Sequence, residues 1–175
     1  HAPKKSHATA VKTIIRYLKC TKDKGTVFKP TKKLDLNLYV DASFAPLYKF
    51  GPDEEPSSAK SRLGWVIFLA GCPLIWKSQL QQDIATSSAE SEYSALSLAL
   101  KMLIPLHNLL IEACEELSLP EEFRSTVSAR AFEDNAAAEQ LAVEQRITNR
   151  TRYYHIKWHW FWNKVKHSNN PDGIV

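Results

Sequence analysis

Three short apolar segments followed by one long helical pattern restrict the folds open to this chain more than any other feature. Residues 34–40 alternate apolar and polar side chains up to Asp41, which predicts a strand with one buried face. Residues 64–70 form a nearly continuous apolar run, as in a buried strand. A turn at Gly71, Cys72 and Pro73 then leads into a third strand over residues 74–77. The folded region therefore opens with three antiparallel strands.

The long helical pattern begins at two serines and continues to about residue 117. Ser87 or Ser88 can cap a helix, and Glu90 and Glu92 suit the positive end of its dipole. Pro105 is expected to kink the helix. Its apolar face comprises Tyr93, Leu96, Leu100, Leu103, Leu106 and Leu110.

The C-terminal third of the chain predicts further helices and strands. Residues 127–132 are expected to form a strand that delivers Asp134, and residues 136–143 and 156–166 to form helices. The last residues, 173–175, are expected to enter another strand. This order of elements predicts an α/β fold with a mixed sheet and helices packed against it.

The N-terminal part differs in character from the remainder of the chain. Residues 6–19 form a basic amphipathic pattern, and residues 21–33 are lysine-rich with Gly25 and Pro30, as in a linker. We therefore predict a division into a basic helix with its linker, residues 1–33, and a folded domain, residues 34–175.

Composition excludes several classes of protein. The apolar share of 44% and charged share of 24% are those of a globular protein, and no apolar run approaches the roughly 18 residues of a membrane span. Cys20, Cys72 and Cys114 lie far apart without metal-binding spacing, which favours reduced thiols and an intracellular location. Residues 50–58 are expected to form a polar loop.

The net charge of +4 conceals an acidic centre between basic flanks. Residues 1–33 carry +9, residues 34–141 carry −9 and residues 142–167 carry +5. Basic flanks around an acidic, metal-dependent centre suit a protein that binds a polyanion. Ordinary solvated helix faces explain the charge equally well.

Three carboxylates occupy positions where stability gives no reason for them. Asp41 and Asp134 follow strands, and Glu92 lies in the first turns of a helix beside core positions. Converging at one end of the sheet, they would form an oxygen cage for Mg²⁺. Each also has a structural interpretation, because Asp often caps a turn and Glu often serves the helix dipole.

The strings around these carboxylates resemble the ribonuclease H region of copia-type retrotransposon polyproteins. The matching strings cover residues 39–44, 60–68, 71–78, 86–97, 132–135 and 150–159, while residues 10–19 resemble the end of the preceding reverse transcriptase. The resemblance implies a ribonuclease H-like fold and hydrolysis of the RNA in RNA–DNA hybrids with Mg²⁺ or Mn²⁺. It also implies the reverse transcriptase of the same polyprotein as a partner.

The resemblance assigns a role to each site residue. Asp41 would bridge two metal ions, Glu92 would bind the ion near the scissile phosphate, and Asp134 would complete the site of the attacking water. Ser88 and Asn135 would contact the hybrid. His155 and His159 are candidates for phosphate contact, although a tryptophan-rich segment is more often core.

The chain also departs from the family pattern. The fourth metal-binding aspartate of the family lies beyond the strand expected near Ile174, so the last strand and helix would be missing here. An alternative is therefore an inactive, domesticated module with a structural or protein-binding role in a larger assembly. A third interpretation is nucleic-acid binding without catalysis, with Trp158, Trp160 or Trp162 stacking on bases.

Overall fold

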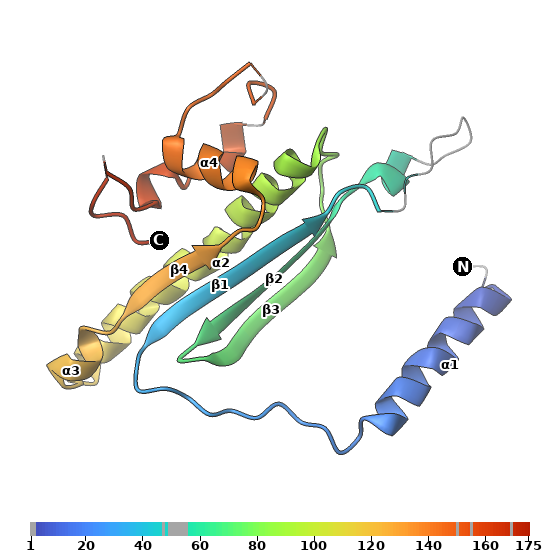
Figure 1. Cartoon of the computed structure of the whole chain (residues 1–175). Helices are drawn as coiled ribbons and strands as arrows, with labels where there is room; N and C mark the ends of the chain where they lie inside the picture. The colour runs from blue at the N-terminus through green and yellow to red at the C-terminus, as the bar shows by residue number, and fades with distance from the viewer. Residues whose placement is uncertain (1–2, 47, 49–55, 150, 155, 169) are drawn as a thin grey trace.

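The structure is a computed structural model that describes residues 3–46, 48, 56–149, 151–154, 156–168 and 170–175. Its centre is a four-stranded sheet with the strand order β3-β2-β1-β4 (Figure 1). The strands are β1 (Asp35–Ser43), β2 (Arg62–Leu69), β3 (Cys72–Leu80) and β4 (Ser128–Phe132). The first three are antiparallel, whereas β4 runs parallel to β1. The predicted mixed sheet and its antiparallel opening are confirmed, while the ribonuclease H-like fold stays a prediction.

The hairpin between β2 and β3 turns one residue earlier than the sequence suggested. Its turn residues are Ala70 and Gly71, whose φ angles of 52° and 77° suit a two-residue turn. Leu69 and Cys72 then pair directly across the hairpin. The predicted turn at Gly71, Cys72 and Pro73 is therefore wrong. Pro73 is tolerated inside β3 because this strand lies at the edge of the sheet.

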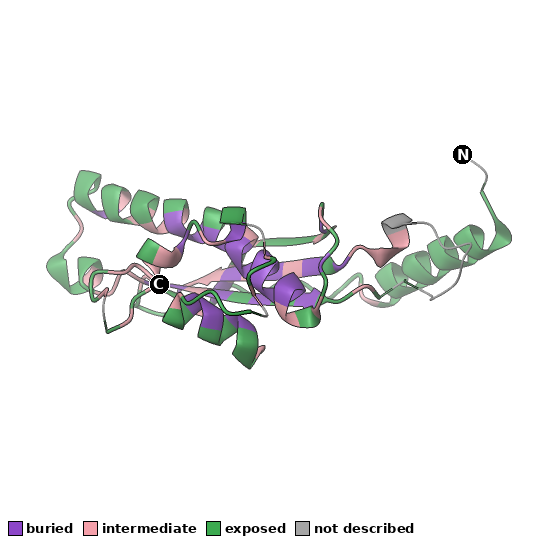
Figure 2. Cartoon of the chain, turned by 90° about the horizontal axis from the view of Figure 1, so that it is seen from above, coloured by how far each residue is buried: buried purple, intermediate pink, exposed green. Residues whose placement is uncertain are grey.

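The long helix α2 (Ser88–Glu116) covers one face of the sheet, as predicted. Ser87 caps it, because its side-chain oxygen accepts a hydrogen bond from the amide of Glu90 at 3.1 Å. The helix continues through Pro105. The fully buried side chains beneath it and on its inner face include Leu36, Leu38, Leu63, Ile67, Tyr93, Leu100 and Leu103. Figure 2 shows burial concentrated in this helix and the sheet.

By length and composition, α2 is the one described helix that could cross a membrane. The sequence was expected to contain no apolar run of sufficient length. Half of the most apolar stretch of α2 is buried inside the protein. Packing against the sheet therefore accounts for the apolar character of this helix.

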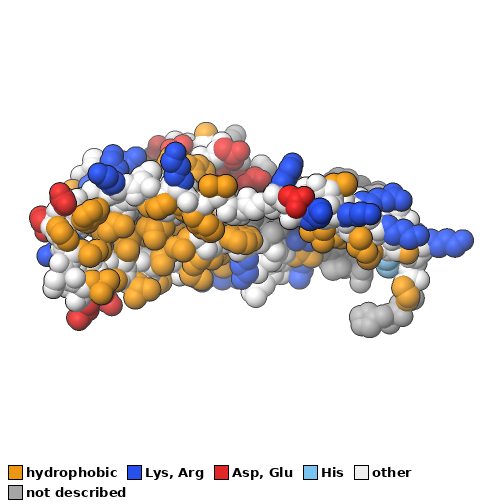
Figure 3. Space-filling model, turned by 90° about the horizontal axis from the view of Figure 1, so that it is seen from below, with side chains coloured by type: hydrophobic (Ala, Val, Ile, Leu, Met, Phe, Trp, Pro, Cys, Tyr) orange, Lys and Arg blue, Asp and Glu red, His pale blue; other side chains and the backbone are white. Residues whose placement is uncertain are grey.

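The opposite face of the sheet carries a row of large side chains. Trp76, Val66, Tyr39 and Phe132 are paired in register across all four strands. The rings of Tyr39 and Phe132 stack with their centroids 4.7 Å apart, and Trp76 is 71% exposed. Hydrophobic side chains also gather on the surface of the molecule seen from below (Figure 3).

The N-terminal helix α1 (Lys5–Cys20) confirms the predicted basic helix, and it buries none of its residues. The segment that follows, up to β1, contains no helix or strand, in agreement with a linker. Figure 1 shows α1 projecting away from the sheet at the end of this extended segment. The division of the chain at residue 33 stays a prediction.

The part of the chain after α2 is helical only in places. It contains α3 (Glu121–Arg124), β4 and α4 (Ala136–Glu144), and the last of these agrees with the predicted helix. The predicted loop over residues 50–58 lies largely outside the described residues, although η1 (Pro56–Ala59) forms a short 3-10 turn.

The predicted helix over residues 156–166 is wrong. Two short 3-10 turns, η2 (Ile156–Trp158) and η3 (Trp162–Lys164), stand in its place. Aromatic residues are weak helix formers, and the indole of Trp160 instead donates to the side-chain oxygen of Ser97 in α2 at 3.0 Å. Packing of individual rings on α2 therefore overrides a regular helix.

The predicted strand at residues 173–175 is also absent. The amides of Ile174 and Val175 both donate to the carbonyl of Lys164, which folds this segment back on η3. Ile174 and Val175 are half-buried against the core. These residues therefore pack locally, and they pair with no strand of the sheet.

Candidate metal centre

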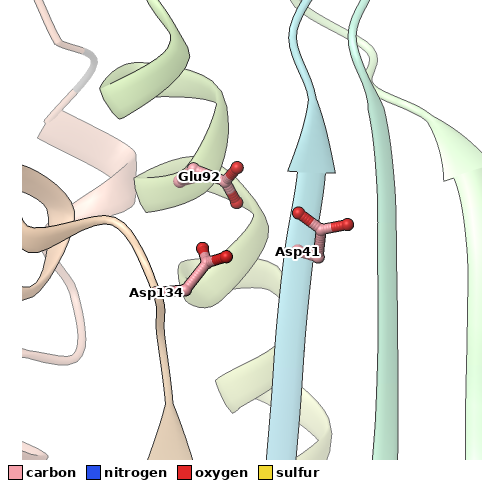
Figure 4. A group of neighbouring side chains, drawn as sticks. All are labelled: Asp41, Glu92 and Asp134. Carbon is pink, nitrogen blue, oxygen red and sulfur yellow. The ribbon is translucent and has the colours of Figure 1, made fainter.

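Three structural elements bring Asp41, Glu92 and Asp134 together. Asp41 lies in β1, Glu92 lies in α2, and Asp134 follows the end of β4. One carboxylate oxygen from each lies within 4.8 Å of the other two. Figure 4 shows the three side chains around one space between α2, β1 and the end of β4. The structure therefore places the three predicted site residues in one cluster.

The cluster forms where the pairing between β1 and β4 stops. The last paired residues are Tyr39 of β1 and Phe132 of β4, whereas β1 continues to pair with β2 as far as Ser43. The prediction that this strand ends at Asp41 is therefore wrong. Beyond Tyr39 the edge of β1 is unpaired on the side of β4, and the backbone of Ala42 hydrogen-bonds Glu92 there.

Glu92 is the buried member of the cluster, with 6% of its surface exposed. Its Oε2 atom is buried without a hydrogen-bond partner among the described residues. Burial, together with the negative charges of Glu133, Asp41 and Asp134, raises the pKa of Glu92 to about 8. A buried oxygen of this kind is costly unless a proton or a cation satisfies it.

The donor set fits a hard divalent cation. All three side chains offer carboxylate oxygens, which Mg²⁺ and Mn²⁺ prefer, and no thiol or imidazole belongs to the cluster. Asp41 and Asp134 are exposed, so a substrate can reach the same space. The unpartnered Oε2 of Glu92 is the observation that most directly favours a cation here.

Glu133 is a fourth carboxylate at this centre, and the sequence analysis missed it. Its Oε1 atom accepts a hydrogen bond from the amide of Asn135 at 3.1 Å, whereas its Oε2 atom is buried without a partner among the described residues. Burial, opposed by hydrogen bonds from the backbone of Asn135 and Asp134 and reinforced by the charges of Asp134 and Asp41, raises the pKa of Glu133 to about 7. The one signal in the sequence was two consecutive acids, Glu133 and Asp134, directly after a strand.

The structure gives Glu90 a structural role. Its Oε2 atom accepts hydrogen bonds from both the amide and the hydroxyl of Thr86, each at 2.7 Å. Glu90 thus fixes Thr86, the residue before the cap, while Ser87 caps the amide of Glu90. This agrees with the choice of Glu92 over Glu90 as the site residue.

The two residues expected to contact the hybrid lie at helix starts beside the cluster. The side-chain oxygen of Asn135 accepts from the amides of Ala137 and Ala138 at 3.1 and 3.2 Å, so Asn135 caps α4. Ser88 is exposed at the first residue of α2. Contact of either residue with a nucleic acid stays a prediction.

His159 belongs to a partly buried network of aromatic side chains. The hydroxyl of Tyr93 accepts from the indole of Trp162 at 2.7 Å, so its own hydrogen can be donated to Nδ1 of His159, 2.8 Å away. Burial raises the pKa of Tyr93 and lowers that of His159, which favours the neutral form of both. This network accounts for His159 as a structural residue. His155 lies outside the described residues.

The tryptophans of the same segment pack mainly into the protein. Trp158 is buried, and the indoles of Trp160 and Trp162 each donate a hydrogen bond to α2. At least two of the three therefore serve the core, as expected. The hypothesis that they stack on bases finds no support in these contacts.

A polar groove lies between the start of α2 and α4, the helix that follows Asp134. It encloses about 760 Å³. The groove was not foreseen, because its walls come from two distant stretches of sequence, residues 86–89 and 137–154. The polar side chains that line it include Thr86, Ser87, Gln140, Arg146, Thr148 and Tyr154.

The raised pKa of Glu92 predicts how stability depends on pH without metal. Because the folded state holds a proton up to about pH 8 that the unfolded chain releases near 4.5, stability should fall as pH rises between these values. Glu92→Gln should remove much of this slope and raise Tm at pH 8 by several degrees. Thermal denaturation in EDTA from pH 5 to 8 measures the effect. The exposed Glu112→Gln on the same helix is the control, and an unchanged slope in Glu92→Gln would contradict the assignment.

The fold and the site define a mixed α/β domain with an oxygen-only carboxylate cluster. Its relatives include the retrovirus-related Pol polyprotein from transposon RE2 of Arabidopsis thaliana, 28% identical over 166 residues, which are 95% of this chain and 10% of the relative. The corresponding polyprotein from transposon TNT 1-94 of Nicotiana tabacum is 28% identical over 158 residues, or 90% of this chain and 10% of the relative. The chain is thus related to a segment of retrotransposon Pol polyproteins and spans about a tenth of their length.

A shorter relative is the secreted RxLR effector protein 161 of Plasmopara viticola. It is 34% identical over 95 residues, which are 54% of this chain and 61% of the relative. No family model matches the chain. No solved structure matches it either. The relatives' names do not say which domain of the polyproteins this segment represents.

Proposed function

We propose that this chain is a ribonuclease H-like domain that hydrolyses the RNA strand of RNA–DNA hybrids with Mg²⁺ or Mn²⁺, as part of a retrotransposon reverse transcriptase. The observation that carries the proposal is the cluster of Asp41, Glu92 and Asp134, whose oxygens lie within 4.8 Å of one another. The relation to Pol polyproteins over 95% of the chain supports the same proposal.

The exposure of each residue in the cluster indicates its role in the proposed reaction. Bound divalent cations would supply an activated water and neutralise charge on the scissile phosphate. Asp41 and Asp134 are exposed and offer their oxygens where the substrate arrives. Glu92, held by the backbone of Ala42, anchors the buried side of the cage. No serine, cysteine or histidine nucleophile is needed for this reaction.

The polar groove between the start of α2 and α4, whose lining also includes the acidic Glu144, can accept the backbone of a nucleic acid. Arg146 and the hydroxyls of Thr148 and Tyr154 can contact phosphate oxygens and the 2′-hydroxyls of RNA. The basic flanks of the chain add a sequence-independent attraction that weakens with salt. These features favour recognition of the shape of the hybrid over recognition of its sequence.

Cleavage of a labelled hybrid tests the proposal. The full chain, with any polypeptide that flanks it in its parent protein, is expected to cut the RNA strand in Mg²⁺ or Mn²⁺. EDTA should abolish cutting, because the carboxylates alone cannot activate water. Single-stranded RNA and duplex DNA serve as control substrates. Failure to cut the hybrid at a metal concentration that saturates the protein would contradict the nuclease assignment.

The effector relative favours a second candidate function. A protein not named as a polyprotein resembles 54% of this chain over 61% of its own length, so part of this sequence also occurs outside Pol polyproteins. The chain would then be an inactive module with a structural or protein-binding role. Metal binding without cleavage in the same assay is the result that this candidate predicts.

A further inference from the structure

Glu133 has one satisfied oxygen and one orphaned oxygen. Its Oε1 atom accepts from the amide of Asn135 at 3.1 Å, which fixes the carboxylate against the start of α4. Its Oε2 atom is buried and has no hydrogen-bond partner among the described residues. A buried acceptor without a donor costs about 1–3 kcal/mol, so this arrangement calls for a missing donor.

Glu92 has an orphaned carboxylate oxygen of the same kind as Glu133. In the described part of the chain, two carboxylate oxygens are buried without partners, Oε2 of Glu92 and Oε2 of Glu133. Glu133 directly precedes Asp134, and its charge acts on Glu92. Glu133 is thus joined to one member of the carboxylate cluster, and its charge acts on the member that holds the other orphaned oxygen.

The protein itself supplies no cation to Glu133. Arg130 and Lys166 line the same cavity of about 280 Å³ as Glu133, yet neither forms an ion pair with it in the part of the chain that the structure describes. Among the described residues, the tight group of oxygens comprises Asp41, Glu92 and Asp134. Glu133 therefore lies beside the cage without completing it.

A hydrated cation would supply the hydrogen-bond donor that Oε2 of Glu133 lacks. Mg²⁺ and similar ions keep several of their waters when carboxylates bind them, and those waters are strong donors. We propose that Glu133 is a positioning residue of the metal centre, whose Oε2 accepts a hydrogen bond from a water of the bound cation and thereby raises cation affinity. The inference rests on the metal centre of the proposed function and adds a residue to it.

Titration of the full chain with Mn²⁺, followed by calorimetry, tests the role of Glu133. Glu133→Gln keeps the size of the side chain and an oxygen for the amide of Asn135, but it removes the charge. Affinity for Mn²⁺ should fall about 10- to 100-fold, the usual effect of removing a partner that supports metal ligands. Glu139→Gln is the matched control, because Glu139 is exposed and lines the same cavity.

Thermal stability separates this role from a structural one. In EDTA, Glu133→Gln should have at least the Tm of the wild type, because it removes a like charge from the cluster, while its Tm gain on adding Mn²⁺ should be smaller. Equal Mn²⁺ affinity in Glu133→Gln and the wild type would overturn the inference, as would absence of Mn²⁺ binding by the wild type.

Cleavage assays on the same variants keep the two proposals apart. Glu133-dependent Mn²⁺ binding without hybrid cleavage supports the inference and contradicts the nuclease function. Hybrid cleavage by the wild type, together with an Mn²⁺ affinity that Glu133→Gln leaves unchanged, supports the nuclease function and contradicts the inference.

Discussion

Asp41→Asn is expected to abolish hydrolysis of RNA in a hybrid, lowering the rate by at least about 10³-fold, the upper range for losing one electrostatic stabiliser. Asparagine keeps the size of the side chain but offers one neutral oxygen. The cage therefore loses a negative charge that Glu92 and Asp134 cannot replace. The side chain is exposed near the end of β1, so the fold should be unchanged. Initial rates of RNA cleavage in Mg²⁺ measure the effect.

Asp35→Asn is the matched control for this variant. Asp35 lies at the start of the same strand, where its carboxylate accepts from the side chain of Asn37 at 2.7 Å. It should retain wild-type cleavage. Circular dichroism and Tm of both variants would show that neither has unfolded. Undiminished cleavage by Asp41→Asn would remove the basis of the nuclease assignment.

Phe161→Ala is expected to cost about 3–5 kcal/mol of stability, as for other fully buried aromatic side chains. Phe161 is 0% exposed, and its ring lies 5.5 Å from that of Tyr93 in α2. About 1 kcal/mol corresponds to about 2–4 °C in a domain of this size, so Tm should fall by roughly 6–20 °C. Denaturant unfolding and calorimetry both measure this loss.

Ile156→Ala provides the control within the same segment. Ile156 is 84% exposed, so its truncation should change stability by no more than about 0.5 kcal/mol. A small effect of Phe161→Ala would mean that the segment after α4 does not pack on α2. The comparison therefore tests whether a segment without regular helices is an integral part of the core.

Elements with a strong local pattern could be predicted from the sequence. The alternation before Asp41 predicted β1, and Ser87 with Glu90 marked the start of α2 to within a residue. The sequence placed the three carboxylates together by expecting Asp41 and Asp134 at strand ends and Glu92 near the start of the covering helix, although Asp41 lies within β1. The predictions of β1 and of the start of α2 depended on residues close together in the chain.

Features that depend on distant partners could not be predicted in the same way. The aromatic pattern after residue 155 suggested a helix, but indole contacts with α2 determine its course. Whether His159 serves the site or the core depends on Tyr93, 66 positions away. Glu133 looked like a second acid beside Asp134, and only the burial of its Oε2 atom distinguishes it.

The short length of β4 has a consequence for how this domain can change. The backbone of Ala42 is available to Glu92 because β4 stops pairing at Phe132. An amide engaged by Glu92 cannot also serve a ladder. An insertion that lengthened β4 would therefore add hydrogen bonds between β1 and β4 but remove the hydrogen bond that anchors Glu92. Sheet pairing and the anchoring of Glu92 therefore compete for the same backbone group at this position.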